Sequence, residues 1–150
     1  MKSINILPFG TAALLLFVGI GAVAGGLGVI LDPSGKSSGV SVDLLMNSPF
    51  KNFLIPGIVL FTVIGLTSLF VSFLTFKQHL LSGGATIVLG FIMILWIVLQ
   101  VYWIGWLTPL QPTFIIIGFA EIILGYVLHS RNLFYFRKFW NHFDHHNHFV

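Results

Sequence analysis

The stretch that decides the fold runs from residue 85 to residue 129, ATIVLGFIMILWIVLQVYWIGWLTPLQPTFIIIGFAEIILGYVLH. Glu121 is its only Asp, Glu, Lys or Arg. A helix needs about 20 consecutive apolar residues to cross a hydrocarbon layer of about 30 Å. Two such runs lie here, 85–107 and 112–129, and the turn between them is short enough to join neighbouring helices. This stretch therefore predicts a transmembrane hairpin.

Two further apolar runs, 7–31 and 53–76, precede this hairpin. The 150-residue chain has 57% hydrophobic and 7% charged residues and a mean hydropathy of +1.00, which leaves too little polar surface for a water-soluble fold. The runs lack the period-two alternation of membrane barrel strands. We therefore predict an all-α integral membrane protein, with an antiparallel four-helix bundle over residues 1–130 and an amphipathic tail over 131–150.

The basic residues beside these runs predict the orientation, because cytoplasmic loops carry an excess of Lys and Arg. Two of the seven lie beside the first connection, Lys36 and Lys51. The other five gather at the opposite end: Lys2, Lys77, Arg131, Arg137 and Lys138. Both termini are therefore expected in the cytoplasm, with the 32–52 loop outside.

The first run is rich in small residues that let helices approach closely. Gly21 with Gly25, and Ala22 with Gly26, have the small-xxx-small spacing of helix contacts. These glycines are predicted to pack either within the bundle or on a homodimer face. Residues 22–24 also loosely match a signal-peptide cleavage site, but the apolar run exceeds the 7 to 15 residues of such a leader.

Glu121 is the residue most suggestive of function. It is expected near mid-membrane, where an acid is costly and marks ion or proton pathways by default. Counting residues from the span ends places Gln100 and Thr62 at a similar depth, so the three are predicted to form an intramembrane polar cluster. The cluster is either a proton- or cation-binding site or a hydrogen-bonded contact between helices.

The tail carries apolar residues at helical spacing beside basic ones, a pattern typical of an amphipathic helix on the anionic inner leaflet. His142, His145 and His146 follow the i, i+3, i+4 spacing at which imidazoles bind Zn²⁺, Ni²⁺ or Cu²⁺. The alternative is a solvated His-rich terminus without metal. No other cofactor is expected.

Several classes of function are disfavoured by composition. The chain has no Cys, which excludes disulfides and thiolate chemistry. The net charge of +3 comes from scattered residues rather than a patch, so nucleic acid is not an expected partner. No Ser, His and acid converge at one predicted depth, so nucleophilic hydrolysis has little support and an enzyme is disfavoured.

Two groups of residues resemble small bacterial membrane proteins with four predicted transmembrane helices and no assigned function. The first group is Gly25-Gly26-Leu27-Gly28 leading to Leu31-Asp32-Pro33-Ser34-Gly35. The second is Ser48-Pro49-Phe50, Leu54-Ile55-Pro56-Gly57, Gln100, Ile104-Gly105 and Leu110-Gln111-Pro112. The resemblance covers roughly residues 20–125 and implies a bacterial plasma (inner) membrane, without implying an activity.

The sequence thus predicts a multi-pass membrane protein with a non-enzymatic association or complex-subunit role. Its expected partners are the lipid bilayer and either a second copy or a larger membrane complex. The alternative is a small proton-coupled transporter or channel component that uses Glu121. An intramembrane enzyme ranks last.

Overall fold

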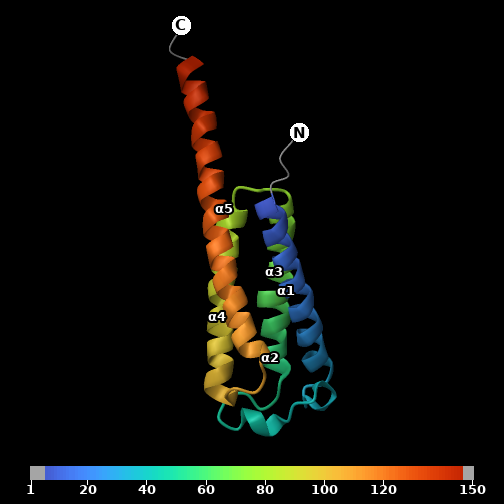
Figure 1. The fold of residues 1–150 in the computed structure, drawn as a ribbon. Helices are drawn as coiled ribbons and strands as arrows, with labels where there is room; N and C mark the ends of the chain where they lie inside the picture. Colours follow the sequence, from blue (N-terminus) through green and yellow to red (C-terminus); the bar gives the residue numbers. More distant parts are fainter. Residues whose placement is uncertain (1–5, 147–150) are drawn as a thin grey trace.

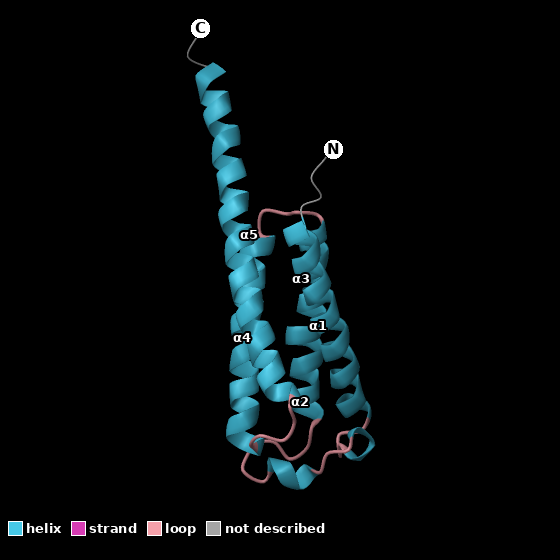
Figure 2. Ribbon diagram, viewed as in Figure 1, coloured by secondary structure: helices cyan, strands magenta, loops and turns pink. Residues whose placement is uncertain are grey.

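Four helical segments dominate the computed structural model, which describes residues 6–146 (Figure 1). They are α1 (Ile6–Leu31), a composite of α2 (Leu54–Val59), the π-helical η3 (Leu60–Leu66) and α3 (Thr67–Phe76), α4 (Ser82–Ile104), and α5 (Leu110–His146). No strand occurs in these described residues (Figure 2). Each segment is long and apolar enough to cross a membrane. The all-α fold and the four candidate spans are therefore confirmed.

The outward faces of the four segments are apolar. Phe17, Phe70, Phe91 and Phe119, one from each segment, are all more than half exposed. Water would hydrate such surfaces at a large free-energy cost, whereas lipid chains would cover them. The exposed surface is therefore compatible with a membrane protein.

α4 and α5 form the most extensive helix contact, and glycines bring them together. A Cβ added at Gly90 would lie 2.5 Å from the carbonyl oxygen of Gly118, and one added at Gly83 would collide with the backbone of His129. Residues farther along α4 therefore contact residues nearer the start of α5: Gly83 lies against His129, and Gly90 lies against Gly118. Backbone-to-backbone approach of this kind is possible only without side chains at the contact.

The composite helix packs in the same way on α1. A Cβ at Gly26 would lie 2.9 Å from the carbonyl oxygen of Gly57, and one at Gly65 would lie 3.0 Å from the amide nitrogen of Val23. The hydroxyl of Ser72 donates a hydrogen bond of 2.7 Å to the carbonyl of Ala12. The molecule therefore consists of two tightly packed hairpins, α1 with α2-η3-α3, and α4 with α5, and contacts between the two hairpins are sparser.

The loop between α1 and α2, residues 32–53, closes one end of the bundle, which we call the loop end (Figure 1). The carboxylate of Asp32 accepts hydrogen bonds from the hydroxyl of Ser34 and the amide of Ser37. These bonds, that of Ser34 above all, lower the pKa of Asp32 to about 2. Ser41 caps a short 3-10 helix, η2 (Val42–Leu45), by accepting from the amide of Asp43. The loop is therefore an ordered structure.

The turn between α4 and α5 is organised by the buried side chain of Gln111. Its Oε1 accepts from the amide of Leu107 at 2.8 Å, and its Nε2 donates to the carbonyl of Gly105 at 3.1 Å. Gly105, with φ 71°, ends α4. α4 therefore spans Ser82–Ile104 rather than the predicted 85–107, and α5 begins at Leu110 rather than at 112.

α5 continues without a break past residue 129, the predicted end of the fourth span, to His146. Its last turns extend beyond the other helices at the end from which α1 begins, which we call the tail end (Figure 1). The predicted boundary at residue 130 is thus not marked by a change in secondary structure. That the tail lies on a membrane leaflet stays a prediction.

Candidate functional site

The carboxyl group of Glu121 is completely buried in the middle of the bundle, with 0% of the residue exposed. Neither of its oxygens has a hydrogen-bond partner among the described residues. A buried polar group without a hydrogen-bond partner lowers the stability of the folded protein, so its presence calls for a reason other than folding. This side chain is therefore the first candidate for a functional group.

The helix contacts show what lies at the depth of Glu121. Gly118 and Ile122 on α5 face Gly90 on α4, so Glu121 is level with Gly90. The preceding residue of α4, Leu89, packs with Leu15 of α1 and Val71 of α3 in an apolar cluster. The acid thus sits in an apolar layer of the bundle.

Buried hydroxyl groups lie near this layer, toward the tail end, but those with assigned bonds donate to carbonyl groups. Thr86 donates to Ser82 at 2.8 Å, and Thr75 donates to Val71 at 2.8 Å. Ser72 donates to Ala12 across the hairpin. These donors are engaged elsewhere, which agrees with the absence of a bond to Glu121 in the described structure.

The structure does not bring Gln100 and Thr62 to Glu121. Gln100 is ten residues farther along α4 than Gly90, which corresponds to about 15 Å along the helix axis. Thr62 is exposed, and its hydroxyl donates to the carbonyl of Ile58 in its own helix at 2.7 Å. The predicted depths are wrong for Gln100 and Glu121 because α4 ends earlier and α5 begins earlier than predicted. The first shift places Gln100 nearer the loop end, and the second places Glu121 farther from it.

A cavity of about 440 Å³ lies on the loop-end side of Glu121, between the two hairpins. We call it the loop-end cavity. Gln100 and Gln111 contribute amides, and the remaining lining is mainly apolar, with Trp96 and Phe114 as its aromatic members. Its floor contains Val18, Ile64 and Met93, which pack with Ile117 one turn before Glu121. One apolar layer therefore separates this cavity from the acid.

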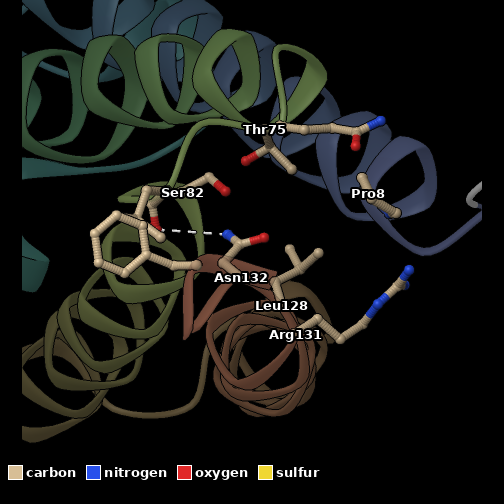
Figure 3. A pocket seen from close by; sticks show the side chains of 9 residues that line it. Pro8, Thr75, Ser82, Leu128, Arg131 and Asn132 are labelled. Carbon is tan, nitrogen blue, oxygen red and sulfur yellow. Dashed lines mark hydrogen bonds between the residues drawn. The ribbon is translucent and has the colours of Figure 1, made fainter. Parts of the chain in front are cut away.

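A second cavity, of about 330 Å³, lies on the other side, where α1 begins and α3 ends (Figure 3). We call it the tail-end cavity. Thr75 and Ser82 face it from the two sides of the α3–α4 loop, and Leu128, Arg131 and Asn132 face it from α5 (Figure 3). The amide of Asn132 donates to the carbonyls of His79 and Leu80, both at 3.4 Å. This cavity is the more polar of the two.

Glu121 lies midway between the cavities along one face of α5. Phe114 lines the loop-end cavity and Leu128 lines the tail-end cavity, each seven residues from Glu121. Seven residues make almost two full helical turns, so the three side chains project from the same face, with about 10 Å between successive levels. Glu121 is therefore about equally far from the two cavities along α5.

The three glycines predicted for helix packing differ in their surroundings. Gly26 lies against Gly57 and Phe61 within the bundle, and a Cβ at Gly25 would make ordinary contact with Leu60 at 3.6 Å. A Cβ at Gly21 would meet nothing within 4 Å. Gly26 therefore has a packing role inside the hairpin, whereas Gly21 borders the loop-end cavity.

The metal prediction lies outside what the structure describes in side-chain detail. His142, His145 and His146 belong to the continuous α5 helix, but their side chains are not among those described. No group of three His, Cys, Asp or Glu side chains gathers elsewhere in the described part of the chain. Binding of Zn²⁺, Ni²⁺ or Cu²⁺ stays a prediction.

Sequence reasoning missed the two cavities and the structural role of Gln111. The seven-residue spacing of Phe114, Glu121 and Leu128 was visible in the sequence, but cavities arise from how two hairpins meet, which no local pattern encodes.

No protein-family model matches the chain, and no match to it was found among curated proteins or solved structures. The resemblance to small bacterial membrane proteins therefore stays a prediction.

Proposed function

We propose that this chain is a multi-pass protein of a bacterial inner membrane and a small proton-coupled carrier in which Glu121 binds and releases the proton. In this proposal the bundle is antiparallel and both termini are cytoplasmic, so the tail end faces the cytoplasm and the loop end faces outward. The distribution of basic residues supports this orientation, since five of seven are expected at the tail end.

One observation carries the proposal: an unpartnered, fully buried acid lies between two cavities. A glutamate retained only to hold helices together would be hydrogen-bonded to a neighbouring helix, and Glu121 has no such bond in the described structure. No Lys or Arg lies in α1, α2-η3-α3, α4 or the part of α5 before Arg131. A permanent ion pair with the acid is therefore not the explanation.

Proton binding would change the interactions of the acid with its apolar layer. The charged and neutral forms of a carboxyl group differ strongly in the cost of lying in such a layer. A displacement of one hairpin along the other would bring Glu121 to one cavity or the other, as required for alternating access. The sparse contacts between the hairpins favour movement at this boundary.

Proton flux into liposomes tests this function directly. We expect flux with the wild-type protein and at least about a tenfold loss with Glu121→Gln, which keeps the size of the side chain but cannot ionise. Thr62→Val is the matched control, because Thr62 is an exposed polar residue of the same membrane domain. Equal flux from wild type and Glu121→Gln would refute the proposal.

Association with a second copy or a larger complex is the second candidate, and the open surroundings of α1 favour it. Gly10, which is exposed on α1, would accept a Cβ without meeting any atom within 4 Å. Another helix has room to approach there. Energy transfer between labelled copies in liposomes tests this candidate: Gly10→Leu should abolish the transfer, and unchanged transfer would exclude Gly10 from any contact between copies.

A further inference from the structure

The tail-end cavity is lined by groups suited to an anion. Arg131 contributes a guanidinium, Gln78 an amide and Ser82 a hydroxyl. Thr75 and Asn132 add polar groups to the lining, but their hydroxyl and amide already donate to carbonyl groups. None of the described residues that line it carries a carboxylate. Arginine matches the geometry of phosphate oxygens with two parallel donors, which makes it the side chain best suited to phosphate recognition.

The depth of Arg131 points to the membrane surface. It follows Glu121 by ten residues on a continuous helix, which corresponds to about 15 Å. If Glu121 lies at mid-membrane, this is half the thickness of a hydrocarbon layer of about 30 Å. Arg131 then lies at the level where lipid phosphate groups begin.

The backbone of Gln78 provides an independent sign that this cavity is functional. Gln78 has φ 52°, in the left-handed region, and is the only residue other than glycine with a positive φ in the described structure. Two bonds end α3 there, from Gln78 to Thr75 at 3.0 Å and from His79 to Leu74 at 2.9 Å. Glycine is the usual residue at this position of a helix end. A strained residue whose side chain lines a cavity suggests that the side chain is needed there.

Apolar residues border the same cavity and continue to the surface. Leu80 and Phe136 line it, and the neighbouring Leu81 and Phe134 are 64% and 66% exposed. Acyl chains would cover these side chains while a phosphate entered the cavity. The volume of about 330 Å³ falls at the lower end of the range of about 300 to 1,000 Å³ for small-molecule sites. The setting thus favours a lipid over a soluble anion.

We propose that the tail-end cavity binds the phosphate headgroup of an anionic phospholipid from the cytoplasmic leaflet. Arg131 contacts the phosphate, and Gln78 and Asn132 border it. The site goes beyond the proton-binding role of Glu121, and only its assignment to the cytoplasmic leaflet rests on the orientation in the proposed function.

Lipid retention tests the proposal on the full-length protein. The protein is equilibrated with equal amounts of phosphatidylglycerol and phosphatidylcholine in detergent, and the lipid that remains bound is measured by native mass spectrometry. We expect a preference for phosphatidylglycerol that Arg131→Gln lowers about tenfold. Arg137→Gln is the matched control, since Arg137 is an exposed arginine on the same helix that does not line the cavity. An equal loss of the phosphatidylglycerol preference in both variants would mean that any basic residue attracts the anionic lipid, and it would overturn the proposal.

Two further variants keep the test decisive. Gln78→Gly removes the amide and the backbone strain together, so it should fold at least as well as wild type and lower the preference about threefold. An unchanged preference in both cavity variants would overturn the proposal. Glu121→Gln should keep the full preference, which separates this site from the proton-binding function.

Inorganic phosphate distinguishes a lipid from a free anion. If the site is built for lipid, millimolar phosphate should not displace phosphatidylglycerol, because phosphate lacks the apolar contacts. Displacement that depends on Arg131 would assign the cavity to soluble phosphate and contradict the lipid proposal.

Discussion

The contacts within each hairpin and the boundary between the hairpins are built in opposite ways. Within a hairpin, glycines such as Gly90 and Gly26 bring backbones together with no room for a methyl group. Between the hairpins lie two cavities and an unpartnered carboxyl group. Close packing makes each hairpin a rigid body, whereas the loosely packed boundary is where binding and movement are least costly. The comparison suggests that function resides between the hairpins.

The largest expected effect comes from breaking a contact within a hairpin. Gly90→Val places a branched side chain where a single Cβ already lies 2.5 Å from the carbonyl of Gly118. We expect a loss of about 3 kcal/mol in unfolding free energy, measured by denaturation in mixed micelles. Gly10→Val, at a position with open surroundings, is the control and should change little. Similar losses in both variants would contradict the packing contrast.

The second prediction concerns the cost of the unpartnered acid. Glu121→Leu replaces the carboxyl group with an apolar side chain of similar size, so the penalty of two unpaired oxygens disappears. We expect the unfolding free energy to rise by about 2 kcal/mol in the same assay, while proton flux is lost. A less stable variant would mean that Glu121 forms bonds that hold the bundle together.

A smaller effect is expected from the hydrogen bond between α3 and α1. Ser72→Ala removes the donor to the carbonyl of Ala12 and should lower the unfolding free energy by about 0.6 kcal/mol. Ser130→Ala provides the comparison, because Ser130 donates only to the carbonyl of Tyr126 within its own helix. A larger loss for Ser130→Ala than for Ser72→Ala would contradict this account of the hairpin.

The smallest effect concerns Asp32 in the loop. Its pKa is lowered from 3.8 to about 2 by its bonds to Ser34 and Ser37, so the charged form stabilises the folded loop. This contribution is complete above about pH 4 and is lost as the pH falls through about 2. Measured against the intrinsic exchange rate at each pH, the amides of residues 34–40 should therefore lose protection as the pH falls from 4 to 2 in wild type. In Asp32→Asn the same amides should already exchange faster at pH 4, and an unchanged rate would disprove this role.

The helices were predictable because their signal is local and strong. Long apolar runs identify the spans, and burial of Gly26 follows from its small-residue spacing. Such features depend on residues close together in the sequence, so they can be predicted without knowledge of the fold.

The candidate site was only partly predictable because its position depends on long-range geometry. Glu121 was identifiable from its own chemistry, but the residues at its depth were not, since a shift of two or three residues at Gly105 and Leu110 changes every depth along the hairpin. The fixed turn comes from Gln111, whose amide bonds reach back to Gly105 and Leu107. A glutamine gives no helix-boundary signal of its own, so this arrangement was not visible in the sequence.

The central claim is that Glu121 lies between two cavities that face opposite sides of the membrane. Chemical labelling along the face of α5 that carries Glu121 tests this claim most directly. The chain has no Cys, so Phe114→Cys and Leu128→Cys each introduce a single thiol, one in each cavity. The account expects an impermeant maleimide added to intact cells to label the first, and to label the second only after the membrane is permeabilised. Labelling of both positions from the same side would contradict it.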